Sequence, residues 1–251
     1  MSWLEYGLRG GILTTHYPHG DDRMPDAYRG EIEFVESAHQ AAAGERIVAD
    51  VCLSHAIADE GGSARVDSLR CFRCGECTRV APERFLNRNH FEVARVAESP
   101  ASVLRALRKR LRSLGRSIHL RHVDAGSDGS EEQELNAIFN PFYDANRLGV
   151  FLTASPRHAD MLVVTGAVTK PMLEPLQRTF AAMPSPKVVI ALGTTACSGG
   201  IFRDRPEIVG PVDAVLPVDV WIPGAPPSPL SILHGIWVAL GHTLAHGEVG
   251  A

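Results

Sequence analysis

The pattern of apolar and polar positions divides the chain near residue 118. Beyond that point, short continuous apolar runs end in glycine or threonine, or just before them, at residues 149–153, 161–165 and 187–192. Such runs are typical of strands buried on both faces of a parallel sheet. Residues 170–183 lie between two of these runs and are expected to form a crossover helix, because Pro184-Ser-Pro186 follows them. The second half therefore predicts an α/β domain.

The first half shows a different pattern of apolar residues. Residues 31–95 hold few long periodic runs, as in small modules where a metal replaces much of the core. A helix from Ser99-Pro100 to Gly115 is expected to follow, because apolar residues repeat there at helical spacing. Those residues are Val103, Leu104, Leu107, Leu111 and Leu114. The basic residues between them form either a solvated face or a docking face for an acidic partner or anionic lipid.

Composition narrows the class of protein. The 251 residues are 45% hydrophobic and 22% charged, as in soluble globular proteins. The net charge of −4 gives no indication of nucleic-acid binding. No apolar run approaches the length of a membrane span, and the first residues lack the pattern of a signal peptide. Five cysteines, three of them crowded together, suit a reducing cytoplasm better than a disulfide framework.

The densest chemical signal is Cys71-Phe-Arg-Cys74-Gly-Glu-Cys77. A CxxCxxC loop presents three thiolates to three irons of a cubane cluster. The fourth ligand of such a cluster comes from a second motif, and this draws attention to Cys52. Structural zinc is the alternative, but it prefers two separated CxxC pairs. The spacing therefore favours one 4Fe-4S cluster bound by Cys52, Cys71, Cys74 and Cys77.

Residues 118–245 resemble the small subunit shared by respiratory complex I (the 20 kDa, B-type subunit) and membrane-bound energy-converting NiFe hydrogenases. The matching stretches are His122–Ser127, Ser155–Thr169, Met183–Ile190 and Pro217–Pro227. The resemblance implies a flavodoxin-like parallel sheet. It also implies two kinds of partner, a hydrogenase or 49 kDa-type large subunit and the subunits of a membrane arm.

The N-terminal part resembles the two-cluster ferredoxin-like subunit of the same complexes, of the complex I 23 kDa type. Gly11–Pro18 and Tyr28–Gly30 carry this likeness. The chain thus resembles a fusion of two neighbouring subunits. We expect a small α+β ferredoxin-like 4Fe-4S module at residues 1–98, a basic linker helix at 99–117, and a small-subunit-like domain at 118–251.

The departures from these families concern cluster ligands. The four cysteines of the small subunit's terminal cluster align with Asp128, Glu131, Thr195 and Ala225, which cannot replace soft sulfur ligands. In the ferredoxin part, one cluster has lost all its ligand positions, at or near Ala42, Glu45, Val48 and Ala81. The other keeps Cys52, Cys71, Cys74 and Cys77. The resemblance therefore implies one bound 4Fe-4S cluster and two lost ones.

Several other residues have more than one possible role. Cys197 is expected to be a small buried residue. Asp128 and Glu131 are expected to complement a helix N-terminus rather than form a cation site. Arg157 and His158 are expected to hold their loop or a neighbouring subunit, with a proton path as the alternative. Trp3, Leu4, Tyr6 and Leu8 suit either a membrane surface or a partner.

These expectations combine into an accessory iron–sulfur subunit of a complex related to complex I and energy-converting hydrogenases. It would lie in the cytoplasm, peripheral on the inner face of the cell membrane, without nucleic-acid partners. We assign no catalytic residue and expect no catalysis by this chain alone. One alternative is a redox-inactive scaffold that couples a large subunit to a membrane arm. Another is an active electron-transfer subunit of an NADH/quinone or hydrogenase type oxidoreductase.

Overall fold

The computed structural model describes residues 2–10, 14–18, 22, 24–35, 48–59, 63–97 and 117–241. Apart from Ser117, the expected basic helix lies outside the described residues, as do Ala42 and Glu45. No helix among the described residues combines the length and the apolar character that crossing a membrane requires.

A six-stranded sheet organises the second half, and its strand order is β5-β12-β10-β8-β6-β7. The strands are β5 (Arg95–Val96), β6 (Ile118–Asp124), β7 (Val150–Leu152), β8 (Met161–Thr165), β10 (Val188–Leu192) and β12 (Val220–Ile222). All neighbours from β12 to β7 pair in parallel. Counted along the chain, these five strands have the order 2-1-3-4-5 of a flavodoxin-like sheet. The expected parallel α/β domain is confirmed.

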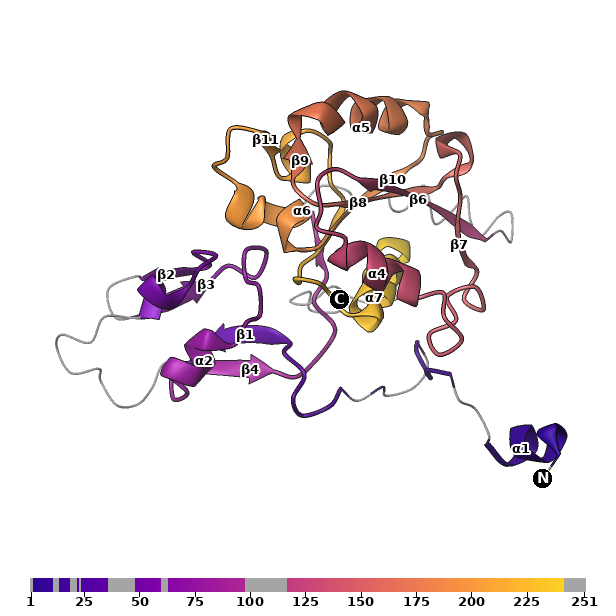
Figure 1. Cartoon of the computed structure of the whole chain (residues 1–251), viewed down its shortest axis with the longest axis horizontal. Helices are drawn as coiled ribbons and strands as arrows, with labels where there is room; N and C mark the ends of the chain where they lie inside the picture. Colours follow the sequence, from indigo (N-terminus) through magenta and orange to yellow (C-terminus); the bar gives the residue numbers. More distant parts are fainter. Residues whose placement is uncertain are drawn as a thin grey trace.

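Helices cover both faces of this sheet (Figure 1). On one face lies α5 (Lys170–Ala182), and on the other lie α4 (Ser130–Ala137) and α7 (Pro229–Leu240). Alternate residues of β8 belong to two separate apolar clusters, Met161 and Val163 to one and Leu162 and Val164 to the other. This alternation explains why the strand is apolar at every position.

Shorter elements complete the second half. They are η2 (Pro156–His158), β9 (Val168–Thr169), α6 (Thr194–Ser198), η3 (Gly200–Phe202), β11 (Ile208–Gly210) and η4 (Val212–Ala214). Strands β9 and β11 pair with each other outside the main sheet. The helix α6 begins directly after β10, so its residues lie at the carboxyl end of a central strand.

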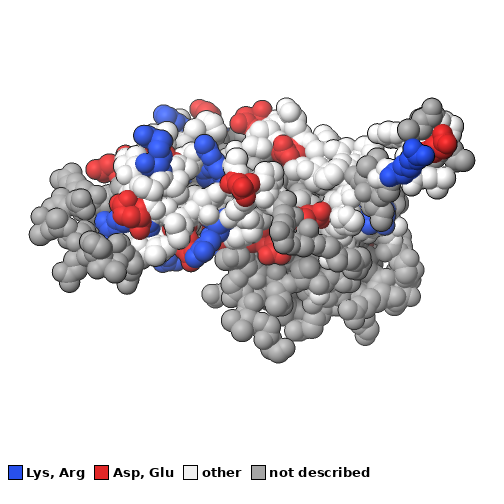
Figure 2. Space-filling model, turned by 90° about the horizontal axis from the view of Figure 1, so that it is seen from below, with Lys and Arg blue, Asp and Glu red and all other residues white. Residues whose placement is uncertain are grey.

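The first half forms a small module beside the sheet (Figure 1). Its strands pair antiparallel, β1 (Glu31–Phe34) with β4 (Phe85–Arg88) and β2 (Ile57–Asp59) with β3 (Ala64–Val66). It also contains η1 (Val48–Val51) and α2 (Glu76–Val80), while α1 (Trp3–Gly10) lies apart at the N-terminus. Figure 2 shows basic and acidic side chains interspersed over the described part of this module.

Segments of the first half pack against the sheet of the second half. Strand β5 follows the small module in sequence but pairs with β12, with Val96 opposite Val220 and Arg95 opposite Trp221. Tyr17 is buried among the side chains that pack on the sheet. The Tyr28 hydroxyl lies 3.0 Å from the Oγ atom of Ser228, the residue that precedes α7 in the sequence. These contacts fix the small module against the carboxyl ends of the strands.

Glycines let the loops at the ends of β6 and β8 touch. Gly166 follows β8 with φ of 73°, and a Cβ there would lie 2.2 Å from the backbone nitrogen of Ser127. Gly129 has a similar φ of 88°, but nothing lies within 4 Å of its Cβ position. An alanine at Gly129 would therefore cost only the strain of a left-handed backbone, whereas an alanine at Gly166 would add a steric clash with the backbone of the neighbouring loop.

Gly129→Ala is expected to lower the free energy of unfolding by about 1 kcal/mol, because it adds only backbone strain. Gly166→Ala is expected to cost about 1–3 kcal/mol more, because backbone atoms rather than a flexible side chain must move. Urea denaturation of the two variants measures both values. Equal losses would show that the loops do not approach as closely as described.

Candidate metal centre

The structure brings Cys52, Cys71, Cys74 and Cys77 to one pocket. Cys52 follows η1, Cys71 and Cys74 lie in the loop before α2, and Cys77 lies in the first turn of α2. Most of the rest of the wall is apolar and includes Ile32, Val51, Leu53, Ala56, Ile57, Val66 and Phe72. Thiols in an apolar wall form a soft donor set that suits iron–sulfur or other thiophilic metals.

Backbone geometry turns the cysteine loop around this pocket. Arg73 and Gly75 both have positive φ values, 57° and 76°. The N–H of Arg73 lies 3.4 Å from the Cys71 Sγ, and the N–H of Ala56 lies 3.3 Å from the Cys52 Sγ. Backbone donors of this kind stabilise thiolate ligands. Within the described residues, no three Cys, His, Asp or Glu side chains converge on a single metal ion.

Burial controls the charge of the thiols. It raises the pKa of Cys71 to about 11 and also raises the pKa of Cys77. Neighbouring cysteines contribute to both shifts in the same direction. With no metal bound, the thiols of Cys71 and Cys77 are therefore held neutral at physiological pH, and a metal that binds them as thiolates must displace their protons.

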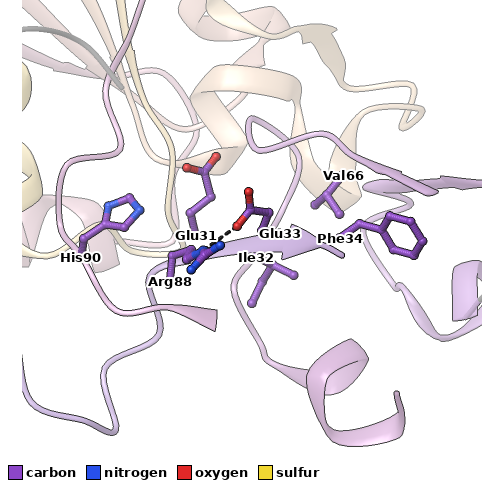
Figure 3. Close-up of a pocket in the computed structure, with 7 residues that line it drawn as sticks. All are labelled: Glu31, Ile32, Glu33, Phe34, Val66, Arg88 and His90. Atoms are coloured by element: carbon purple, nitrogen blue, oxygen red, sulfur yellow. Dashed lines mark hydrogen bonds and ion pairs between the residues drawn. The ribbon is translucent and has the colours of Figure 1, made fainter. Parts of the chain in front are cut away.

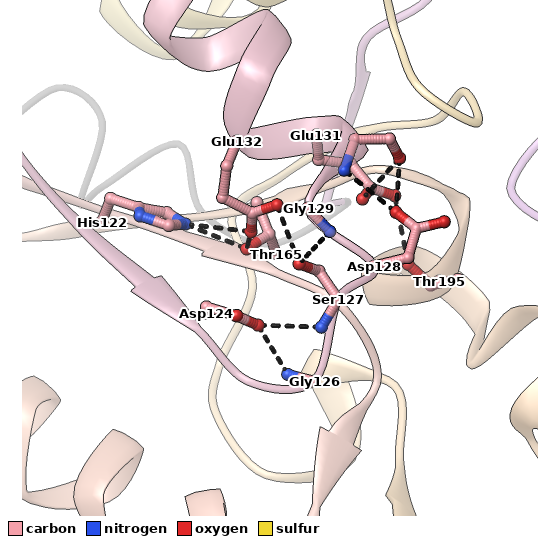
Figure 4. A network of polar contacts seen from close by, with 11 residues as sticks. His122, Asp124, Gly126, Ser127, Asp128, Gly129, Glu131, Glu132, Thr165 and Thr195 are labelled. Carbon is pink, nitrogen blue, oxygen red and sulfur yellow. Dashed lines mark hydrogen bonds and ion pairs between the residues drawn. The ribbon is translucent and has the colours of Figure 1, made fainter.

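The four positions expected to match the cysteines of the family's terminal cluster carry oxygen and carbon instead of sulfur. Three of them, Asp128, Glu131 and Thr195, join one polar network at the ends of the strands (Figure 4). The fourth, Ala225, is exposed in the loop before α7. These side chains do not fit an iron–sulfur cluster, since they offer no thiolate.

Glu131 fills space inside this network. It is 3% exposed, and its carboxyl oxygens lie 3.2 Å from Thr195 Oγ1 and 3.2 Å from Ser130 Oγ. A Cβ on Gly193 would lie 2.4 Å from its Oε1 atom, so the carboxyl packs directly on that glycine. Burial raises the pKa of Glu131. The residue lies in the first turn of α4, as expected, but it points into the protein.

Asp128 behaves differently from Glu131. Its Oδ1 atom accepts hydrogen bonds from the backbone N–H of Ser130 at 3.0 Å and from the Ser130 hydroxyl at 2.6 Å. Ser130 is the first residue of α4. Asp128 therefore satisfies a backbone donor at the helix start, as the sequence indicated, and these hydrogen bonds lower its pKa.

The sequence did not predict one group of interacting polar side chains, at the carboxyl ends of β6 and β8. The Nε2 atom of His122 lies 2.9 Å from Thr165 Oγ1 and 3.4 Å from Glu132 Oε1, and Ser127 Oγ donates to the other oxygen of Glu132 (Figure 4). Burial lowers the pKa of His122, which favours a neutral ring. This group could have been anticipated only from the positions of its residues near strand ends. Strands β6 and β8 are parallel neighbours, so their carboxyl ends lie at the same edge of the sheet.

The remaining candidates lie apart from the cysteine pocket. Cys197 is buried on α6, donates its S–H to the Ala191 carbonyl at 3.5 Å, and has its pKa raised by burial. Arg157 and His158 are exposed in η2. Tyr6 and Leu8 of α1 are 65% and 79% exposed.

Comparisons with known proteins agree on the second half of the chain. Residues 129–239 match the family described as NADH ubiquinone oxidoreductase, 20 Kd subunit. The probable membrane-bound hydrogenase subunit mbhJ of Pyrococcus furiosus is 46% identical over 127 residues, which are 51% of this chain and 76% of that protein. Formate hydrogenlyase subunit 7 of Escherichia coli is 43% identical over 146 residues, which are 58% of this chain and 56% of that protein.

A solved structure of the membrane-bound sulfane sulfur reductase, an archaeal respiratory membrane complex, also aligns. It is 29% identical and covers 53% of this chain and 74% of its own, with a TM-score of 0.47.

Glu131→Gln is expected to stabilise the protein at neutral pH, by roughly 1 kcal/mol. A raised pKa means that stability is greatest below the ordinary value of 4.5 and falls as the buried carboxyl ionises at higher pH. Glutamine stays neutral, so its advantage should appear only as the pH rises. Urea denaturation at several pH values from 4 to 8 measures this difference.

Asp128→Asn is the matched control, for which the expected change in stability at neutral pH has the opposite sign. Its pKa is lowered, so its contribution is present above the ordinary value of 3.8 and is lost as the pH falls through the folded-state pKa. The variant should therefore be less stable than the parent at neutral pH. The same pH trend in both variants would contradict the assigned environments.

Proposed function

Because the chain belongs to the family of the 20 kDa subunit of NADH:ubiquinone oxidoreductase, we propose that it is an iron–sulfur subunit of a membrane-associated complex. That complex would be related to respiratory complex I and energy-converting hydrogenases. The relatives' own names describe subunits of a membrane-bound hydrogenase and a formate hydrogenlyase. The partners would accordingly be a large subunit of the hydrogenase type and subunits of a membrane arm.

One 4Fe-4S cluster would be held by Cys52, Cys71, Cys74 and Cys77. The observation that carries this proposal is that all four cysteines line one largely apolar pocket. When bound, such a cluster supplies one-electron chemistry. The protein supplies the four ligands, the backbone N–H groups of Ala56 and Arg73 near two of the sulfurs, and a largely apolar wall. We interpret residues 1–98 as a ferredoxin-like module, which its antiparallel strand pairs and short helix support.

The terminal cluster of the family would be absent. Thiolates are missing at Asp128, Glu131, Thr195 and Ala225, and the buried Glu131 carboxyl occupies part of that region. An electron on the proposed cluster would then lack the usual next carrier towards a quinone or a NiFe centre. The chain would therefore serve as an accessory subunit rather than as a quinone reductase or hydrogenase by itself.

A redox-inactive scaffold is the second candidate. Cys52, Cys71 and Cys77 pack against a cluster of buried residues made by Ile32, Ile57, Ala64, Ala81 and Phe85. Small cores of this kind often need a metal to fold. In this role the bound metal would hold the module together, and the subunit would only couple a large subunit to a membrane arm.

We place the chain at the cytoplasmic face of the membrane as a peripheral subunit. The naming of its relatives as membrane-bound and the exposed Tyr6 and Leu8 of α1 support this placement. Contact of α1 with a partner subunit is the alternative.

Cys74→Ser is expected to remove most of the iron from the purified protein, whereas Cys197→Ser is expected to leave it unchanged. Cys74 is an exposed member of the proposed ligand set, and Cys197 is buried elsewhere. Iron and sulfide analysis after anaerobic purification should find about four irons per parent chain. Zinc in place of iron, about eight irons, or equal iron loss in both variants would refute the assignment.

A redox titration separates the two candidates. An electron-transfer subunit should show a reversible one-electron change in its visible and paramagnetic resonance spectra at a potential within the range of known clusters. A cluster that is reduced only when the protein unfolds would instead support the scaffold.

A further inference from the structure

Arg73 is the only buried arginine in the part of the chain that the structure describes, and it is 7% exposed. It lies in the loop that carries three of the proposed cluster ligands, directly before Cys74. Its backbone nitrogen lies 3.4 Å from the Sγ atom of Cys71. The loop therefore holds a positive charge inside the protein, beside the proposed ligands.

Residues of both halves of the chain surround this side chain. Arg73 lines a pocket together with Cys74 of its own loop and with Ala225, Pro226 and Ser228 of the second half. Water and dissolved salt screen a buried charge much less than they screen an exposed one. The charge of Arg73 therefore acts more strongly on its surroundings than the charge of a surface arginine does.

The arginines beside β1 have a different environment. Figure 3 shows Arg88 in an ion pair with Glu33, at 2.5 Å, and the Arg88 side chain is 54% exposed. Glu31, whose carboxylate also acts on Arg73, forms an ion pair with Arg95. Each of these pairs has no net charge, so the pairs add little to the electric field at the cysteine pocket.

The charge of Arg73 acts on the proposed ligands. The guanidinium and a thiolate at Cys71 attract each other. Reduction of a bound cluster adds one electron from the donor, while no bond forms or breaks, so the cluster and its thiolates become more negative. A nearby cation stabilises this reduced form more than the oxidised form, and so raises the reduction potential.

We propose that Arg73 sets the reduction potential of the 4Fe-4S cluster by holding a positive charge beside its ligands. This inference rests on the proposed function, because it requires a cluster that carries electrons. It adds a residue that binds no iron but changes how readily the cluster accepts an electron. Substituting the side chain keeps the backbone N–H near Cys71, so the charge can be changed separately from that contact.

The test is an anaerobic redox titration of the iron-loaded protein, followed by its visible and paramagnetic resonance spectra. At a fixed potential, Arg73→Gln should lower the ratio of reduced to oxidised cluster on the order of tenfold, as one charge does over about 10 Å in a protein interior. Arg73→Lys keeps the charge and should titrate close to the parent. Arg65→Gln removes an exposed arginine on β3 of the same module and should leave the potential unchanged. The effect of Arg73→Gln should persist when salt is raised from about 0.1 M to about 1 M, because a buried charge is screened little.

An unchanged potential in Arg73→Gln would overturn the proposal. An equal fall in Arg73→Gln and Arg73→Lys would overturn it too, because packing rather than charge would then be responsible. If Arg73→Gln lost its iron, retention of iron by Arg73→Lys would support a charge needed at the ligands, and loss from both would reduce Arg73 to a structural role. A parent protein without iron would instead refute the proposed function, so iron content measured on the same samples separates the two failures.

Discussion

The first half of the chain depends on packing thiols against a very small apolar core. Of the described residues there, Ile32, Ile57, Ala64, Ala81 and Phe85 form the buried cluster, and two of the five are alanines. Such a core buries too little apolar surface to offset the conformational entropy of folding by itself. The cysteines complete its wall, so any metal bound there contributes directly to folding. The remaining stability comes from contacts with the sheet, through β5 and Tyr17.

The proposed loss of the terminal cluster would leave a packing problem as well as a gap in the series of electron carriers. At one of the positions where we infer a lost sulfur ligand, this chain has Glu131, whose longer side chain reaches Thr195 and packs on Gly193. A buried carboxyl is tolerated because hydroxyls of Thr195 and Ser130 lie within hydrogen-bond distance of its oxygens and because its raised pKa favours the neutral form. The substitution therefore fills volume without creating a second metal site of sulfur character.

The sequence was most informative where one physical rule dominates. Continuous apolar runs at residues 161–165 and 187–192 fixed two central parallel strands, because only strands buried on both faces need apolar residues at every position. The CxxCxxC spacing, with Cys52, identified the side chains that line one pocket. Neither the pairing of β5 with β12 nor the contact of His122 with Glu132 and Thr165 was foreseen. Both depend on long-range placement of polar or short segments, which no local periodicity encodes.

The position of Arg73 bears on the electrostatics of the proposed cluster. Its side chain is buried in the same loop as three of the proposed ligands, and its positive charge opposes the rise in the pKa of Cys71 that burial causes. A fixed cation there favours added negative charge at the ligand pocket, which for an electron-carrying site means a higher reduction potential.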